Sequence, residues 1–209
     1  MEFKDRKEAG RLLAEKFTAD SAEDIVVVAL PRGGVPLGLE IAKHLQAPLD
    51  LVITRKIGSP QNPEYAIGSL AENSEPLLNR RETRYLNKDW LEAAISKARN
   101  EIIRRQTLYF ENHQRQTFTG KTVILVDDGI ATGFTVLAAI DEIKQQNPKK
   151  LILAVPVLPK EMVTLLSEKV DELVVLTIPD YYRGSVGAYY KAFPQLTDDE
   201  VKQLLAESR

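Results

Sequence analysis

The chain of 209 residues contains no cysteine and only two histidines, His44 and His113. The absence of cysteine excludes disulfides, cysteine metal sites and thiol nucleophiles, and it fits a reducing compartment. Neither histidine lies in a loop that carries other candidate site residues. We therefore assign no function to either of them.

Long apolar runs and a strong net charge are also missing. No apolar stretch approaches the about 20 residues that a membrane span needs. Residues 1–17 are rich in Glu, Lys and Arg and do not resemble a signal peptide. The formal net charge is −2, so no basic field points to nucleic acid. We expect a cytoplasmic protein without a membrane or nucleic-acid partner.

The composition is that of an ordinary soluble globular chain. Apolar residues make up 44% and charged residues 28% of the sequence. The length suits one α/β domain with a modest appendage and a substantial core. Because we find no internal repeat, low-complexity tract or linker, we expect residues 1–209 to form a single domain.

The most informative stretch, residues 123–135, reads V-I-L-V-D-D-G-I-A-T-G-F-T. Its first four residues form a short apolar run, typical of a strand buried on both faces of a parallel sheet. Two aspartates end the run, and a turn of small residues follows at 129–133. Residues 134–145 then have helical spacing. The pattern predicts a strand, an acidic tip, a tight loop and a helix.

This arrangement predicts a phosphate site. A tight loop beside a helix N-terminus exposes several backbone N–H groups, and these bind anions. Thr132 and Thr135 add hydroxyl donors. Asp127 and Asp128 cannot themselves hold phosphate, but they suit ribose hydroxyls or a Mg²⁺ ion that a pyrophosphate brings with it.

The stretch resembles the signature of the type I phosphoribosyltransferases, which bind 5-phosphoribosyl-1-pyrophosphate (PRPP). That signature is four apolar residues, two acids, a short linker and Thr-Gly-x-Thr. The resemblance implies Mg²⁺-dependent transfer of the 5-phosphoribosyl group between PRPP and a nitrogenous base. It implies that Asp127 and Asp128 hold the ribose hydroxyls and, directly or through water, the metal. The residues implied at the 5′-phosphate are Ile130, Ala131, Thr132, Gly133, Phe134 and Thr135.

The rest of the chain alternates apolar strand patterns with helical ones. Strands are expected at 25–30, 49–54, 151–158 and 173–178, and helices at 5–17, from about 35, at 161–169 and after Thr197. The alternation favours a mostly parallel sheet between helices, an α/β/α sandwich. Loops that follow parallel strands lie at one edge of the sheet, so they can converge on one site.

Two of these loops carry cations. Pro31-Arg32-Gly33-Gly34 resembles the pyrophosphate loop of the family, which often carries a non-proline cis peptide. Its glycines allow the backbone to approach a ligand closely. Arg55 and Lys56 end the expected strand at 49–54. The resemblance places these two side chains, with Arg32, at the pyrophosphate.

The turn-rich residues 57–71 are expected to be mostly loop, with a short strand near 66–70. In the family, a flexible lid lies at this place, and Glu64 and Tyr65 are its candidate contacts. Residues 76–79 form a possible further short strand.

A long helix is expected to follow, as an insertion at about 86–113. Asp89 and Glu92 suggest an acidic capping box at its start. Its apolar stripe is Leu91, Ile95, Ala98 and Ile102. The opposite face carries Lys97, Arg99, Arg104 and Arg105, which we interpret as a solvated face rather than an RNA-binding one.

The aromatic segment 179–194 resembles the part of 6-oxopurine enzymes that presents a ring to the base. Tyr181 or Tyr182 is the candidate base-stacking residue. We expect this segment to join residues 1–18 and the closing helix in a small hood, at 1–18 and 179–209, over a core at about 20–180. Thr197 and Glu200 predict a capping box on that helix. The family resemblance also suggests a homo-oligomer, a dimer.

Three departures leave the acceptor open. Hypoxanthine and guanine enzymes carry an aspartate where Ala131 stands and a lysine near Val157, whereas here Lys160 is displaced. Phe134 occupies a position often held by glycine. Two other interpretations therefore remain beside the enzyme: a regulator that senses PRPP without turnover, and a nucleotide-binding interaction module.

Overall fold

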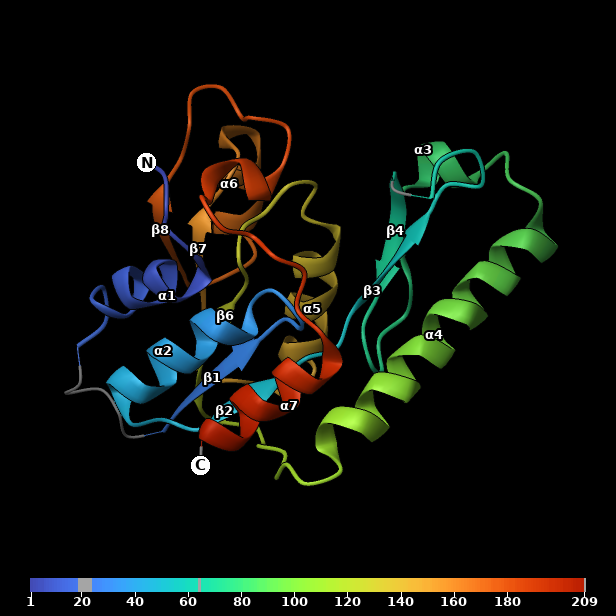
Figure 1. The fold of residues 1–209 in the computed structure, drawn as a ribbon. Coiled ribbons are helices and arrows are strands. Elements are labelled where there is room, and N and C mark those ends of the chain that lie inside the picture. Colours follow the sequence, from blue (N-terminus) through green and yellow to red (C-terminus); the bar gives the residue numbers. More distant parts are fainter. Residues whose placement is uncertain (19–23, 64, 209) are drawn as a thin grey trace.

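The computed structural model describes residues 1–18, 24–63 and 65–208. Its centre is a sheet of five strands in the order β2-β1-β6-β7-β8, and every pairing within it is parallel (Figure 1). The strands are β1 (Ile25–Ala29), β2 (Leu49–Leu51), β6 (Thr122–Val126), β7 (Lys150–Val157) and β8 (Glu172–Thr177). The expected α/β fold with a mostly parallel central sheet is confirmed.

Helices cover both faces of this sheet. The helices α1 (Arg6–Ala14) and α2 (Val35–Leu45) pack on one face, and α5 (Phe134–Lys144) and α6 (Lys160–Ser167) pack on the other. Successive strand residues point to opposite faces. Ile124 and Val126 accordingly join the core beneath α1 and α2, whereas Val123 and Leu125 join the core beneath α5.

Strand β2 is shorter than the sequence suggested. The expected strand at 49–54 ends at Leu51, so Arg55 and Lys56 belong to a separate strand. The carboxylate of Asp50 accepts the N–H of Leu51 at 2.8 Å and that of Gln116 at 2.7 Å. The N–H of Val52 donates to Ala29 of β1, so the N–H of Leu51 points away from β1, and Asp50 binds it at the open edge of this outermost strand.

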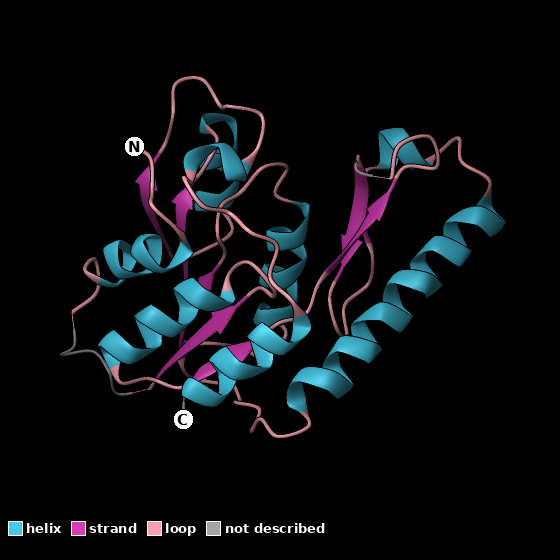
Figure 2. Cartoon of the chain, viewed as in Figure 1, coloured by secondary structure: helices cyan, strands magenta, loops and turns pink. Residues whose placement is uncertain are grey.

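Residues 55–110 form an appendage that we call the arm (Figure 2). It contains the antiparallel strands β3 (Arg55–Gly58), β4 (Ala66–Leu70) and β5 (Leu77–Leu78), the short helix α3 (Arg80–Thr83) and the long helix α4 (Lys88–Phe110). Strand β3 was not predicted: it pairs with β4 as a hairpin, so residues 57 and 58 of the expected loop are strand. Short strands do occur at 66–70 and within 76–79, as predicted.

The start of α4 differs from its prediction. Asn87 is the N-cap, and its side chain accepts the N–H of Trp90 at 3.0 Å. The Asp89–Glu92 capping box is therefore wrong, because the helix begins two residues earlier and Asn87 caps it. Of the predicted stripe, Ala98 and Ile102 are buried.

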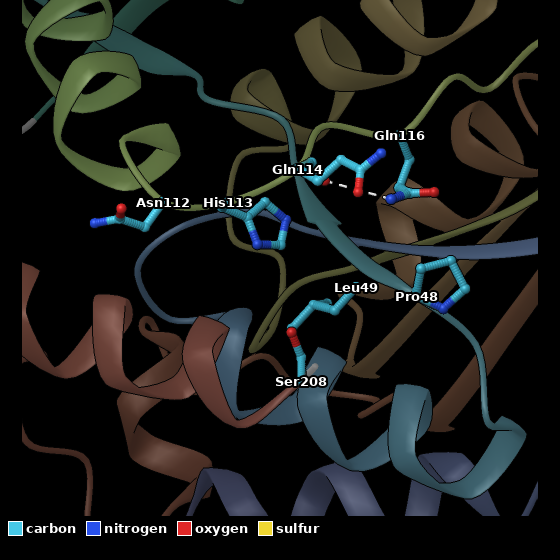
Figure 3. A pocket seen from close by; sticks show the side chains of 7 residues that line it. All are labelled: Pro48, Leu49, Asn112, His113, Gln114, Gln116 and Ser208. Carbon is cyan, nitrogen blue, oxygen red and sulfur yellow. Dashed lines mark hydrogen bonds between the residues drawn. The ribbon is translucent and has the colours of Figure 1, made fainter.

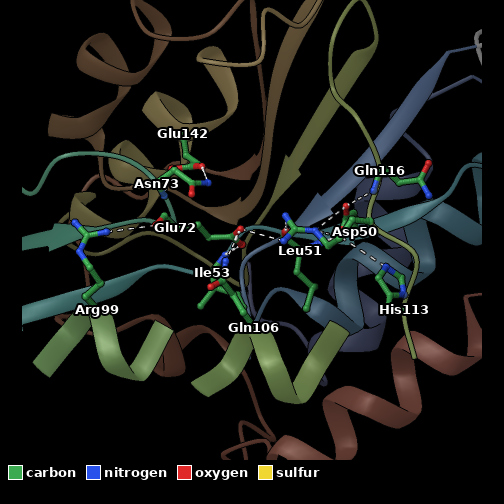
Figure 4. Close-up of polar contacts among 11 residues, drawn as sticks. Asp50, Leu51, Ile53, Glu72, Asn73, Arg99, Gln106, His113, Gln116 and Glu142 are labelled. Carbon is green, nitrogen blue, oxygen red and sulfur yellow. Dashed lines mark hydrogen bonds and ion pairs between the residues drawn. The ribbon is translucent and has the colours of Figure 1, made fainter. Parts of the chain in front are cut away.

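A buried polar network fastens the arm to the sheet (Figure 4). Arg115 lies between the wholly buried Asp50, at 3.3 Å, and Glu72, at 3.0 Å. Glu72 also accepts the N–H of Ile53 and the amide of Gln106, each at 3.0 Å. The network joins β2, the end of the hairpin and α4, and it thereby fixes where the arm meets the core.

The terminal segments meet above the sheet. The N–H of Phe3 donates to the carbonyl of Tyr189 at 2.8 Å, and Phe3 forms a bridge with Tyr190. Helix α1 packs against α2 in the helical layer on the same face of the sheet. The closing helix α7 (Asp198–Glu207) has the predicted capping box and packs on α2 and α4. Within the described ranges, no helix combines the length and apolar character required to cross a bilayer.

Candidate functional site

The candidate site lies where the order of the parallel strands reverses, between β1 and β6. Strands β1 and β6 are neighbours, while β2 extends the sheet on one side and β7 on the other. The loops after β1 and β6 therefore face each other at a topological switch point, the usual ligand position in such sheets. A cleft of ≈ 180 Å³ opens there. Its lining residues are Leu30, Pro31, Thr54, Arg55, Lys56, Arg105, Asp127 and Thr135.

Four of the predicted site residues line this cleft: Asp127, Thr135, Arg55 and Lys56. Arg32 does not line it. The Arg32 guanidinium lies 4.0 Å from a carboxylate oxygen of Asp198, at the start of α7. The predicted loop is present, with a cis peptide between Pro31 and Arg32, but its cation points toward a helix that sequence patterns could not place beside it.

The loop before α5 has the backbone geometry of an anion site. Gly133 is the N-cap with a φ of 79°, a left-handed conformation that favours glycine. The first N–H groups of α5 have no partner within the helix, and Thr132 is exposed beside them. The hydroxyl of Ser69 on β4 donates to the carbonyl of Phe134 at 2.6 Å, which ties the loop to the arm.

Ile130 differs from the other residues predicted at the 5′-phosphate. Its N–H donates to the carbonyl of Val157 at 3.0 Å, and its side chain is buried in the core beneath α5. Because this N–H already has a partner, Ile130 anchors the loop. The donors that face outward come from the residues that follow, Ala131 to Thr135.

Glycine is required at the two positions that pack against the acidic tip. A Cβ at Gly33 would overlap a carboxylate oxygen of Asp128, and one at Gly34 would lie 2.6 Å from the carbonyl of Val126. Both contacts would be far closer than van der Waals contact. The loop after β1 can therefore lie directly on the tip of β6.

The two aspartates face different surroundings. Asp127 lines the cleft, and one of its oxygens accepts the N–H of Asp128 at 2.9 Å. Asp128 instead lies 2.8 Å from Nε of Arg6 on α1. Burial raises the pKa of both carboxyls; the negative charge of Asp128 adds to this rise at Asp127, whereas Arg6 opposes it at Asp128. No local sequence signal could have indicated Arg6.

Arg105 is a second site residue that the sequence did not reveal. It lines the cleft, although its helix face was interpreted as solvated. Nε of Arg105 lies 2.8 Å from Glu101, and only 11% of its side chain is exposed. Hydrogen bonds from Arg104 and then Arg105 lower the pKa of Glu101 to about 2. The interpretation as a solvated face is therefore wrong for Arg105, and Arg99 too bonds the carbonyls of Glu72 and Ser74.

The predicted aromatic residues lie outside the cleft lining. Tyr181 is 90% exposed, whereas the ring of Tyr182 stacks on Tyr189 with 5.8 Å between centroids. The Tyr182 hydroxyl is buried and has no hydrogen-bond partner among the described residues. Burial is the main cause that raises the pKa of this phenol to about 12. A buried hydroxyl without a partner is costly, so it suits a ligand or water contact.

At the predicted lid, Tyr65 lies in the turn between β3 and β4. Its hydroxyl donates to Glu82 at 3.1 Å, and its side chain is exposed. This contact holds the tip of the hairpin to α3. The other predicted lid residue, Glu64, lies outside the described residues.

The cleft lining offers one carboxylate, that of Asp127, to a magnesium ion brought by a phosphate ligand. Mg²⁺ prefers carboxylate and phosphate oxygens and usually keeps several waters. Asp127 offers a carboxylate whose ionised form is disfavoured by burial and by the neighbouring Asp128, which together raise its pKa. A cation beside it would relieve both effects. Asp127 is therefore the residue that would hold the metal most directly.

A larger cavity of ≈ 410 Å³ lies at the start of β2 and contains none of the predicted site residues (Figure 3). Its lining residues are Pro48, Leu49, Asn112, His113, Gln114, Gln116 and Ser208. This end of β2 is the opposite edge of the parallel sheet from the cleft. The smaller cleft is the better candidate site, because only there do carboxylate, cations and a helix N-terminus converge.

Comparison with known proteins identifies relatives of this chain. Proteins from two strains of Mycobacterium tuberculosis, both provisionally named phosphoribosyl transferases, are 40% identical over 205 residues, or 97% of this chain. The match covers 46% of their length, so the chain spans about half of these curated relatives.

Solved structures show the same fold. The TT1426 protein of Thermus thermophilus is 39% identical, with a TM-score of 0.82 and coverage of 99% of both chains. The AQ2163 protein of Aquifex aeolicus shares the fold at 16% identity, with a TM-score of 0.51 over 83% of this chain and 74% of its own.

A family model described as the phosphoribosyl transferase domain matches residues 2–191. This range includes the switch-point loops, the cleft and the arm. The chain therefore belongs to the phosphoribosyl transferase domain family.

Proposed function

We propose that this protein is a Mg²⁺-dependent phosphoribosyltransferase that moves the 5-phosphoribosyl group between PRPP and a nitrogenous base. The observation that carries the proposal is the cleft itself. It gathers the carboxylate of Asp127, the hydroxyl-bearing Thr135 at the start of α5, and three cations, Arg55, Lys56 and Arg105. These groups match a ligand with ribose hydroxyls, a monophosphate and a pyrophosphate.

The ligand contact proposed for each group follows from its position in the cleft. The N–H groups of residues 131–135 and the threonine hydroxyls bind the 5′-phosphate. Asp127 accepts hydrogen bonds from the ribose hydroxyls. The three cations steady the departing pyrophosphate as ribose C1 gains oxocarbenium-like character, and a bound magnesium ion would neutralise further charge on it.

The acceptor base is proposed to lie beside the aromatic segment. Gly129, which follows the acidic tip, packs under Val186 of this segment. Tyr182 has a buried hydroxyl with no partner in the described structure, and that hydroxyl can donate to a ring nitrogen or an exocyclic oxygen. The exposed Tyr181 could cover the base from outside.

Calorimetry with PRPP, with and without Mg²⁺, tests the binding half of the proposal. We expect PRPP to bind at least about 10-fold more weakly in chelator, because its dense negative charge meets the carboxylate of Asp127 without a cation between them. Equal affinity in both conditions would exclude the metal role. Size-exclusion chromatography with light scattering would test the proposed dimer.

Pyrophosphate release with a panel of bases tests the chemical half. Turnover with any base supports the enzyme. Tight, magnesium-dependent binding of PRPP without turnover of any base would favour a regulator that senses PRPP. Because the curated relatives are about twice as long, the assay should also include any longer form of the chain.

Replacement of Arg105 by methionine should raise the Kd for Mg–PRPP by about 10- to 100-fold. Methionine keeps the apolar stem but removes a donor to a charged acceptor, worth roughly 1.5–3 kcal/mol. Arg104→Met is the matched control: Arg104 lies on the same helix as Arg105 and pairs with Glu101 and with Asp198 of α7, but it does not line the cleft. An equal increase in this Kd in both variants would mean that Arg105 stabilises α4 and does not contact the ligand.

A further inference from the structure

The two aspartates at the end of β6 have different partners, because Asp128 contacts the first helix and Asp127 does not. Beyond Val126, which faces α1 and α2, the chain continues with Asp127 in the cleft and Asp128 on the α1 side. Nε of Arg6 donates to a carboxylate oxygen of Asp128 at 2.8 Å. The side chains are only 10% and 14% exposed, so this pair is largely removed from water.

Arg6 is itself held in place on two further sides. One of its terminal nitrogens donates to the carbonyl of Pro194 at 2.7 Å, and its guanidinium lies over the ring of Phe193, 3.7 Å from the centroid. Asp5 caps the same helix by accepting the N–H of Glu8 at 2.8 Å. An arginine fixed by a carbonyl, a ring and a helix start has little freedom to leave Asp128.

Asp128 is constrained from the other directions as well. The hydroxyl of Tyr190 donates to its carbonyl at 2.6 Å. Gly33 lies so close to its carboxylate that a methyl group there would overlap the oxygen. Three segments, α1, the aromatic segment and the loop after β1, thus converge on this one residue.

We propose that Arg6 is a positioning residue which withdraws Asp128 from the ligand, so that Asp127 alone presents a carboxylate to the sugar and the metal. The inference rests on the proposed function, since it concerns the same site. Without Arg6, two adjacent carboxylates would share the tip. With it, one of them is neutralised by a fixed cation, and the site carries one free acid.

Manganese binding in the absence of PRPP tests this arrangement without any turnover. Mn²⁺ takes the same oxygen ligands as Mg²⁺, and its binding is measured by electron paramagnetic resonance. In Arg6→Gln, Asp128 becomes available beside Asp127. We expect this variant to bind Mn²⁺ at least about 10-fold more tightly than the wild-type protein, because two carboxylates then face the ion.

A charge-balanced variant shows whether a change in Mn²⁺ affinity comes from the freed Asp128 carboxylate or from a disturbed fold. Arg6→Gln combined with Asp128→Asn replaces the ion pair by two amides that can still hydrogen-bond. We expect its Mn²⁺ affinity to stay within about threefold of wild type, whereas Asp127→Asn loses at least about 10-fold. Arg11→Gln is the control on the same helix, since Arg11 forms an exposed pair with Glu40 at 3.0 Å.

The possible outcomes decide between the alternatives. Loss of Mn²⁺ affinity in the charge-balanced variant as large as in Asp127→Asn would show that Asp128 is a ligand, and would overturn the proposal. Unchanged Mn²⁺ affinity in Arg6→Gln would also overturn the proposal. Failure of both the wild-type protein and Arg6→Gln to bind Mn²⁺ would overturn it as well. If Arg6→Gln does not fold, the charge-balanced variant alone decides.

Binding of Mg–PRPP to the same proteins separates this inference from the proposed function. If the wild-type protein does not bind PRPP but the Mn²⁺ series behaves as expected, the proposed function fails and the division of the acids stands. If PRPP binds and the Mn²⁺ series fails, Asp128 serves the ligand and only the role given to Arg6 is wrong.

Discussion

Asp127→Asn is expected to raise the free energy of unfolding at neutral pH, while Asp128→Asn lowers it. The pKa of the Asp127 carboxyl is raised well above its ordinary value by burial and by the charge of Asp128. A raised pKa means that the ionised carboxylate is disfavoured in the folded state relative to the unfolded chain. An amide removes that penalty, and its oxygen can still accept the N–H of Asp128.

The stabilisation of Asp127→Asn should depend on pH in a defined direction. An acid with a raised folded-state pKa takes up a proton first in the folded protein, so the wild-type protein gains stability as the pH falls through that raised pKa. The neutral amide does not titrate. The advantage of the variant is therefore largest above the raised pKa and disappears below the ordinary value of an aspartate.

Asp128→Asn should have the opposite effect although burial also raises the pKa of Asp128, because the variant leaves Arg6 as a buried cation without its partner. The Arg6 guanidinium, with 10% of its side chain exposed, would lose the carboxylate that pairs with it. We expect a loss of roughly 1.5–3 kcal/mol, the range for a hydrogen bond to a charged group. The charge-balanced variant at Arg6 and Asp128 should recover part of this loss, because no unpaired charge remains.

Urea unfolding at neutral and acidic pH, with Asp127→Asn, Asp128→Asn and wild type in parallel, measures both effects. Turnover should fall on the order of 100-fold in Asp127→Asn despite its added stability, since a group aimed at the reacting sugar is lost. Two destabilised variants, or two stabilised ones, would contradict the separate surroundings assigned to these acids.

The sequence predicted the core of this site because local patterns are strong there. A buried parallel strand shows as a continuous apolar run, and residues 123–126 and 25–29 are indeed strands. The turn of small residues that ends at Gly133 and the helix after it were also predicted, and α5 begins at Phe134. Each of these features depends on neighbours within a few positions along the chain.

The features that sequence reasoning missed depend on residues far apart. Arg6 lies 122 positions from Asp128, and no periodicity connects them. The face of α4 that carries Arg105 was interpreted as solvated. Its burial depends on the packing of α4 against β3 and on the network around Glu72, neither of which the local sequence shows. The early end of β2 likewise has no local signal, because Arg55 and Lys56 pair with Leu70 and Ser69 of β4 instead of continuing β2.

The acceptor can be tested from the positions where this chain departs from the 6-oxopurine enzymes. Ala131 is exposed at the place where their aspartate stands, and it cannot exchange a proton. Val157 is fully buried in β7, and its carbonyl accepts the N–H of Ile130. Lys160 begins α6, is largely exposed and lies 4.0 Å from Asp180. Neither a proton acceptor for the ring nor a fixed donor for the 6-oxygen is supplied at these three positions.

We therefore expect hypoxanthine and guanine to be poor acceptors, with kcat/KM at least ~100-fold below that of the true substrate. A site that hydrogen-bonds its substrate discriminates steeply against one whose polar groups remain unpaired. The measurement is pyrophosphate release with Mg–PRPP and hypoxanthine, guanine, xanthine, adenine, uracil and orotate in parallel. Ala131→Asp provides the matched test, since it restores an acid at the loop and should selectively raise turnover of the 6-oxopurines. Efficient use of hypoxanthine by the wild-type protein would mean that another group, for which the buried hydroxyl of Tyr182 is the first candidate, replaces the missing partner.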